Sequence, residues 1–220
     1  LPVLQALRGQ FETVATCTTR METATMAARH FGVPQAFDSV ARMLRECPGI
    51  DIVCVSVRPI DQYAVVMQAL EAGKHVYCEH PFGTSLAQAQ AMRDLARRKG
   101  VRSVVGHEHH YEPAMLEMQA RIAAGWIGQP ISFGISFFND GMIHARRNER
   151  PWLAQGAMGG PRAWRTGHSL ERVMSALGGI AAVCADMGVY SPPGPVPVTQ
   201  TNNVNLLLRT RSGATGCLQV

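Results

Sequence analysis

Lysine is scarce in this chain, and paired cysteines and long hydrophobic runs are absent from it. Lys74 and Lys99 are the only lysines, so the net charge of +5 comes almost entirely from arginine, and the arginines are scattered. A nucleic-acid groove normally needs a basic stripe interleaved with aromatic residues, so we expect no nucleic-acid partner. No apolar run approaches the ~18 residues that a membrane-spanning helix requires, and we expect no membrane partner.

The six cysteines form no C-x-x-C pair, and most of them lie in apolar runs, where a thiol behaves as a small hydrophobic group. No charged-then-apolar leader opens the sequence. Both features favour a reducing, cytoplasmic location. With 220 residues, 46% of them hydrophobic and 17% charged, the composition is that of a globular protein of one or two domains.

The N-terminal half alternates strand-like and helix-like segments. The strand-like runs are "FETVATCTT", "GIDIVCVSV", "HVYC" and "VRSVVG", and helical segments, two of which end at Gly32 and Gly100, lie between them. Short connections between such segments predict parallel βαβ units in a doubly wound sheet. Ligands of such sheets bind beyond the carboxyl ends of the strands. This places 18–20, 56–59, 79–81 and 106–110 along one rim.

From about Pro113 the pattern changes to a helix, the alternating strand "ISFGISFF", and a Gly/Arg-rich loop that reaches Gly167. A short helix "SLERVMSALG", a proline-rich connector over 191–197 and further strand-like runs follow. We interpret "IAAVCADM" and the methionines at 115 and 118 as core. The sequence therefore predicts a Rossmann-like α/β domain over 1–112 and an α+β domain with a mostly antiparallel sheet over 113–220.

The motif "AGKHVYCEHP", followed by "LAQAQAMRDLARRKGV", "RIAAGWIGQP" and "GHSLERVMSALGG", resembles the Gfo/Idh/MocA family of NAD(P)-dependent oxidoreductases. The resemblance covers essentially the whole chain. It implies hydride transfer between a nicotinamide cofactor and a sugar- or polyol-like alcohol, and assembly into a homo-dimer or tetramer through the open face of the second sheet. The first strand and glycine-rich loop of the family are expected upstream of Leu1, and the rest of the second domain beyond Val220.

Two departures from the family pattern concern its catalytic residues. His80 stands where most relatives carry lysine, and Trp164 stands where an aspartate precedes the histidine that matches His168. These departures resemble the Gal80-like subgroup, some members of which bind a dinucleotide and regulate without catalysis. A non-catalytic regulator that acts through protein partners is therefore the alternative function.

His80 and His168 are the candidate catalytic residues. A neutral imidazole can accept the hydroxyl proton of a carbinol near neutral pH, although His80 could instead only hydrogen-bond and His168 could only cap or pack a helix. Pro81 is a candidate cis-proline. Thr18, Thr19 and Arg20 offer donors and positive charge where an acid would favour NAD, so NADP is favoured over NAD, unless this loop contacts no cofactor. The other expected cofactor contacts are Ser56, Val57, Arg58, Gln62, Glu79 and Pro81.

The expected substrate-binding residues lie in the second half of the chain. Arg162 and Arg165 flank Trp164 and could grip a carboxylate or phosphate, or could belong to an exposed loop. His109 lies in "GHEHHYEP", where His107 and His109 would share one face of a strand. A metal-dependent lyase or hydrolase is a third interpretation of this run, but the sequence supplies no third ligand, so we predict no metal site.

Overall fold

The structure is a computed structural model of the 220-residue chain, and it describes residues 1–138, 154, 161–190, 197–199 and 201–220, with 161–164 described as backbone only. The chain forms two compact units. The first comprises Leu1–Ser56, Asp61–Cys78 and Gln90–Val104, and the second comprises Val57–Ile60, Glu79–Ala89 and Val105–Val220. The division between 112 and 113 remains a prediction.

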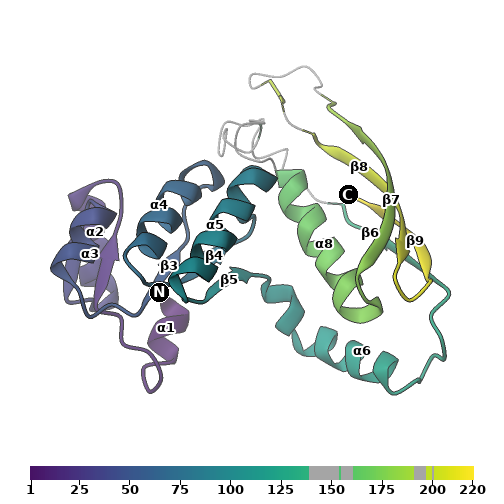
Figure 1. The fold of residues 1–220 in the computed structure, drawn as a ribbon, viewed down its shortest axis with the longest axis horizontal. Helices are drawn as coiled ribbons and strands as arrows, with labels where there is room; N and C mark the ends of the chain where they lie inside the picture. Colours follow the sequence, from purple (N-terminus) through teal and green to yellow (C-terminus); the bar gives the residue numbers. More distant parts are fainter. Residues whose placement is uncertain (139–153, 155–160, 191–196, 200) are drawn as a thin grey trace. The chain divides into compact units, whose positions relative to one another are not determined.

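The first unit alternates strands and helices, as the sequence predicts (Figure 1). Its elements are α1 (Pro2–Ala6), β1 (Ala15–Cys17), α2 (Met21–Phe31), β2 (Gln35–Phe37), α3 (Val40–Glu46), β3 (Ile52–Val55), α4 (Pro59–Glu71), β4 (His75–Glu79), α5 (Leu86–Lys99) and β5 (Ser103–Gly106), several of which extend into segments of the second unit. The strand β2 is too short for its pattern to be recognised in the sequence. The predicted α/β class is confirmed.

Two parallel sheets organise these strands. One pairs β1 with β2, and the other has the order β3-β4-β5, with β3 and β4 parallel in the register Ile52↔His75 to Val55↔Cys78. Both β3 and β4 therefore end at the same edge of their sheet.

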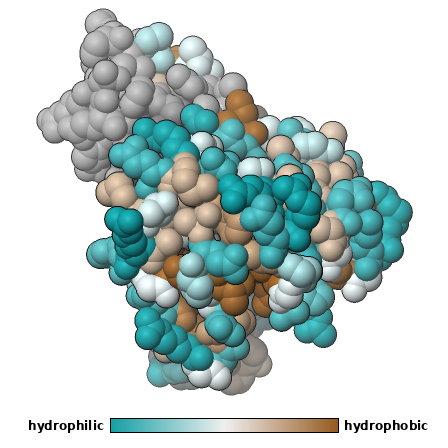
Figure 2. All heavy atoms as spheres, turned by 90° about the vertical axis from the view of Figure 1, so that its left-hand side faces the viewer, coloured by the Kyte–Doolittle hydropathy of each residue, from teal (hydrophilic) through white to brown (hydrophobic). Residues whose placement is uncertain are grey.

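Figure 2 shows the face that carries α2 and α3, where hydrophilic side chains predominate and hydrophobic ones form a band between them.

Local sequence signals account for several helix ends. Gly32 ends α2 in the left-handed conformation (φ 61°), where a side chain would be strained. The Ser39 hydroxyl accepts a hydrogen bond from the Arg42 amide (3.4 Å), and the Ser85 hydroxyl accepts one from the Gln88 amide (3.2 Å). Both serines act as N-caps.

The second unit contains a four-stranded mixed sheet in the order β6-β9-β8-β7. Its elements are the 3-10 helix η1 (Glu108–Tyr111), α6 (Pro113–Ala123), β6 (Ser132–Ser136), α8 (Pro161–Leu177), β7 (Ile180–Gly188), β8 (Asn203–Thr210) and β9 (Thr215–Gln219). The pairs β7–β8 and β8–β9 are antiparallel, and β6–β9 is parallel. This confirms a mostly antiparallel sheet.

The core of this unit lies between the sheet and α8. Val204, Leu206, Leu208, Leu218 and Val220 are buried, and Leu170 of α8 packs against them. The strand β7 is different, because its residues from 181 to 187 are exposed. The assignment of "IAAVCADM" to the core is therefore wrong. The reason is that β7 is the edge strand, while α8 contacts β8.

The methionines of α6 are also not core residues. Met118 is 40% exposed and Met115 is half-buried. The apolar face of α6 is thus only partly covered within the described residues. No helix of the described residues is both long enough and apolar enough to cross a membrane.

Candidate functional site

His80 and His168 lie side by side in the second unit. Their rings are stacked, with centroids 4.7 Å apart and an angle of 29° between the planes. His80 directly follows β4, and its peptide bond to Pro81 is cis, as proposed from sequence. His168 lies within α8, which begins at Pro161, so the expectation of a loop up to Gly167 and a histidine just before the helix is wrong.

Two further imidazoles surround this pair. The His107 ring lies edge-on to His80, with centroids 4.7 Å apart, and the His109 ring lies edge-on to His168 at 5.0 Å. Residues 80, 107, 109 and 168, here called the histidine cluster, therefore come from three separate segments of the chain. This cluster brings together the two predicted catalytic histidines and the predicted substrate contact His109.

Helix α8 approaches the cluster at a glycine. A β-carbon on Gly167 would overlap the imidazole of His80. Glycine at this position therefore lets the helix backbone lie directly against the ring. Glycine is otherwise unfavourable in a helix interior by about 1 kcal/mol relative to alanine.

Carboxylates flank the histidine cluster on its η1 side. His109 Nδ1 lies 2.5 Å from Glu112 Oε1, and His110 Nδ1 lies 2.7 Å from Glu171 Oε1. The second contact joins η1 to α8. The run "GHEHHYEP" thus forms a 3-10 helix from Glu108, so the expectation that His107 and His109 alternate along a strand is wrong.

Burial favours the neutral forms of His80 and His168. Desolvation, with smaller contributions from His168 and His107, lowers the pKa of His80 to about 3. Desolvation also lowers the pKa of His168. Within the part of the chain that the structure describes, the buried Nδ1 atoms of His80 and His107 have no hydrogen-bond partner. His80 is therefore an uncharged imidazole of low basicity with an unsatisfied ring nitrogen.

The predicted cofactor contacts lie at or beyond the carboxyl ends of their strands. Thr18, Thr19 and Arg20 follow β1, and the Thr18 hydroxyl hydrogen-bonds to the Arg20 carbonyl (2.8 Å) and to the Thr23 hydroxyl (2.6 Å). Ser56, Val57 and Arg58 follow β3, and Gln62 is buried in α4. Glu79 is the last residue of β4. Their cofactor contacts remain predictions.

Of the two predicted substrate-binding arginines, the structure describes the side chain of Arg165 and not that of Arg162. Arg165 in α8 places its guanidinium 5.3 Å from the centroid of the Phe137 ring, so the side chain packs against an aromatic residue of the second unit. The side chains of Arg162 and Trp164 lie outside the described residues. The connector over 191–196 also lies outside them.

Sequence reasoning missed four members of this region: His110, Glu112, Glu171 and Gly167. A carboxylate three residues after His109 was a readable signal, because such spacing places both side chains on one side of a helical turn. No sequence signal links His110 to Glu171, since their contact depends on how η1 packs against α8.

The family model described as "Oxidoreductase family, NAD-binding Rossmann fold" matches residues 1–107. Residues 1–107 are therefore similar to the Gfo/Idh/MocA family. Among curated proteins, the chain is 31% identical over 146 residues to dehydrogenase aclE of Aspergillus oryzae, covering 66% of this chain and 40% of that protein. It is 29% identical over 169 residues to levoglucosan dehydrogenase of Pseudarthrobacter phenanthrenivorans, covering 77% of this chain and 40% of that protein.

Solved structures extend the likeness across both units. An NAD-binding oxidoreductase from Klebsiella pneumoniae is 29% identical with a TM-score of 0.78, and the alignment covers 94% of this chain and 56% of that one. A levoglucosan dehydrogenase in complex with NADH and levoglucosan has a TM-score of 0.86 at 24% identity, covering 94% of this chain and 57% of that one, and shows the fold alone. The chain spans 40% of the length of each of the two curated relatives above.

Proposed function

We propose that this protein is a nicotinamide-dependent oxidoreductase that transfers hydride between the cofactor and a sugar- or polyol-like alcohol. One observation carries the proposal. In a chain whose first 107 residues match an NAD-binding oxidoreductase family, two imidazoles stack 4.7 Å apart, one of them directly after the carboxyl end of a parallel strand. Relatives that include a levoglucosan dehydrogenase and a scyllo-inositol 2-dehydrogenase support an alcohol of the sugar or polyol class.

Oxidation of a carbinol requires that its C–H bond is held in place and that its hydroxyl proton has an acceptor. A bound nicotinamide supplies the hydride acceptor. We assign the hydroxyl contact to His80, because its neutral imidazole directly follows β4, at the edge of the sheet where β3 and β4 both end. With a pKa of about 3, His80 is a hydrogen-bond acceptor and only a weak base. His168 supports this ring by stacking on it.

NADP is the cofactor that the residues after β1 favour. The Arg20 side chain is exposed at the start of α2, and Thr18 and Thr19 stand beside it, where an acid would repel a ribose phosphate. The names of two relatives favour NAD instead, because scyllo-inositol 2-dehydrogenase is named for NAD(+) and the solved levoglucosan dehydrogenase is a complex with NADH. Glu79, Ser56 and the other predicted contacts after β3 and β4 complete the proposed cofactor site.

We also propose that the protein forms a homo-oligomer through the sheet of the second unit. The side chains of Cys184, Leu207 and Cys217 form one row across three strands, and all three are exposed. Leu207 is 64% exposed.

All six cysteines are free thiols, which is consistent with the predicted cytoplasmic location.

A Gal80-like regulator is the second candidate function. The low pKa of His80 favours it, because a group that resists protonation is a poor replacement for a catalytic lysine. Such a protein would bind the dinucleotide and act through protein partners without turnover. Cofactor binding alone therefore does not distinguish the two functions.

The test uses the full-length protein and two measurements. Binding is followed by the fluorescence of NADPH and NADH, and turnover is followed as NAD(P)H absorbance with a panel of sugars and polyols. The enzyme predicts binding and turnover, with turnover lost in His80→Ala and retained in His30→Ala, which alters an exposed histidine at the end of α2. Binding without turnover on any alcohol supports the regulator, and absence of binding refutes both.

A further inference from the structure

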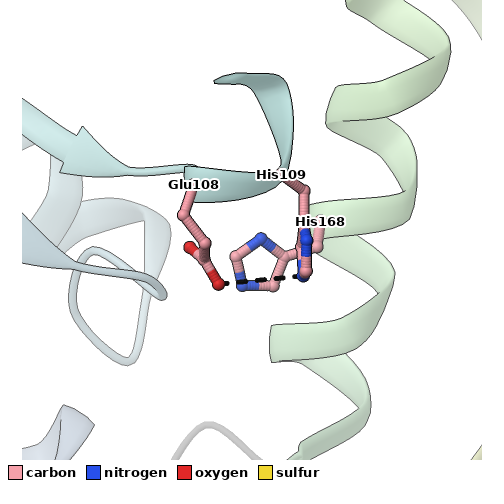
Figure 3. Close-up of side chains that lie close together, drawn as sticks. All are labelled: Glu108, His109 and His168. Carbon is pink, nitrogen blue, oxygen red and sulfur yellow. Dashed lines mark ion pairs between the residues drawn. The ribbon is translucent and has the colours of Figure 1, made fainter. Parts of the chain in front are cut away.

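Three potential ligand atoms converge at the histidine cluster, and two of its members supply one each. Glu108, His109 and His168 each offer one such atom, and these atoms all lie within 4.8 Å of one another. Figure 3 shows the carboxylate and the two imidazoles gathered on the side of η1 that faces α8. The first two residues are neighbours in η1, while His168 comes from α8. The run "GHEHHYEP" offered no third ligand by sequence alone. The packing of η1 and α8 in the second unit brings His168 to this position.

The donor set indicates a class of ion. Two imidazoles and one carboxylate suit zinc and related divalent transition metals, whereas magnesium and calcium prefer oxygen ligands alone. Ligand atoms about 2 Å from one ion at tetrahedral angles are separated by about 3.3 Å. Glu108 Oε1 and His109 Nε2 are 3.7 Å apart, so an ion between them would need only a small closure.

The surroundings of His109 orient its ring for this role. Its Nδ1 contacts Glu112 Oε1 at 2.5 Å, which leaves Nε2 on the side of Glu108. A metal-bound histidine commonly gives its other ring nitrogen to a carboxylate, which fixes the ring and strengthens its donation. Glu112 is therefore a positioning residue and not a ligand.

We propose that Glu108, His109 and His168 form a binding site for one divalent transition-metal ion of the zinc class. Three protein ligands leave a fourth tetrahedral position open, and the Glu108 side chain is 57% exposed, so a water or hydroxyl oxygen can reach that position. The inference does not depend on the proposed oxidoreductase function. The ion would occupy a place next to His80, whose ring stacks on the ligand His168.

The test is metal binding by the full-length, untagged protein after treatment with a chelator and desalting. Calorimetric titration with zinc chloride gives stoichiometry and affinity, and the absorption spectrum with cobalt chloride reports the ligand type. We expect one zinc ion per chain and a cobalt spectrum of tetrahedral nitrogen and oxygen ligation. Because six free cysteines are present, a cobalt–thiolate charge-transfer band would show binding elsewhere and would overturn the assignment.

Variants separate the site from other binding. Glu108→Gln and His109→Ala change exposed and half-exposed side chains, so the fold should persist, and each should weaken zinc binding by at least about tenfold. Glu112→Gln should weaken binding by about 10- to 100-fold as a positioning effect. His30→Ala and Glu22→Gln, on exposed parts of α2, are the matched controls and should bind as the parent does. Unchanged affinity in both Glu108→Gln and His109→Ala would refute the site, whatever the outcome of the turnover assays.

Discussion

Gly167 and His80 are in direct contact across the second unit, and the contact has no room for a methyl group. The backbone of α8 lies against the imidazole at this point, while the neighbouring residue His168 stacks on the same ring. One helical turn thus fixes the position of His80 from two sides. The contact with His80 requires glycine at position 167. The helix itself does not, because glycine weakens helices.

Gly167→Ala should therefore destabilise the protein although alanine is the better helix former. Overpacking of this kind costs about 1–3 kcal/mol, against a gain in helix propensity of about 1 kcal/mol, so we expect the free energy of unfolding to fall by about 1 kcal/mol. Urea denaturation measures the change. In a His80→Ala background the overlap is removed, and the same substitution should become neutral or stabilising.

Gly49→Ala is the control for this pair, because a β-carbon at Gly49 meets no atom within 4 Å and its φ is not left-handed. Its effect should be the same with or without His80. If Gly167→Ala is equally destabilising in both backgrounds, the His80 ring is not what the glycine accommodates.

The stability of the protein should fall on acidification because of His80. Its pKa is about 3 in the folded protein, against 6.5 for an unperturbed histidine, so between these values the unfolded chain binds a proton that the folded protein does not. Stability is therefore present above pH 6.5 and is lost as the pH falls toward 3. The lowered pKa of His168 acts in the same direction. Thermal unfolding from pH 7 to pH 4 should show a steeper decline for the parent than for His80→Asn.

His30→Asn provides the reference for that pH series, since it changes an exposed histidine at the end of α2. Its decline with acid should match that of the parent. A His80→Asn curve that runs parallel to the parent curve would mean that His80 takes up its proton at the same pH in both states.

The start of α8 was not predictable from its local sequence. The run "GGPRAWRTGH" reads as a loop, because glycine and proline punctuate it, yet Pro161 suits the first turn of a helix and Gly167 is required by the His80 contact. Local signals thus indicated the presence of the helix and not its start. The identity of His80 and His168 as neighbours followed only from the family resemblance.

Other features depended on tertiary packing that no local pattern encodes. The apolar strand β7 reads as core, but its place at the edge of the sheet leaves its middle residues exposed. The convergence of His109 with His168 needs η1 to pack on α8. By contrast, the strand and helix order of the first unit was predictable apart from β2, because the hydrophobic period and the glycine stop agree there.

The link between η1 and α8 should contribute measurably to stability. His110 Nδ1 and Glu171 Oε1 are 2.7 Å apart and their side chains are 33% and 19% exposed. A charged hydrogen bond that is partly buried should give a coupling of about 1 kcal/mol in a double-mutant cycle of His110→Ala and Glu171→Gln. The exposed pair Arg121–Glu117 in α6 is the comparison, for which about 0.3–0.5 kcal/mol is expected. Equal couplings would show that partial burial adds nothing here.

The proposed oligomer should dissociate when its open sheet face is charged. Leu207→Glu introduces a charge in the middle of the exposed row of β8, without touching the core residues Leu206 and Leu208. Light scattering after size exclusion should change from a dimer or tetramer to a monomer. Val3→Glu changes an equally exposed hydrophobic residue of α1 in the first unit and should leave the assembly intact. A parent protein that is already monomeric would refute the proposal.

Cofactor preference should respond to the charge at the start of α2. Arg20 is exposed there and its side chain makes no ion pair among those found in the described residues, so its positive charge is available to a ribose phosphate. Arg20→Ala should raise the Kd for NADPH by about tenfold, the effect of losing one charged contact worth ~1.4 kcal/mol, and should leave the Kd for NADH nearly unchanged. Arg29→Ala, at the far end of the same helix, is the control. Equal losses for both cofactors would assign Arg20 to the shared part of the dinucleotide, and no loss for either would place the cofactor away from this loop.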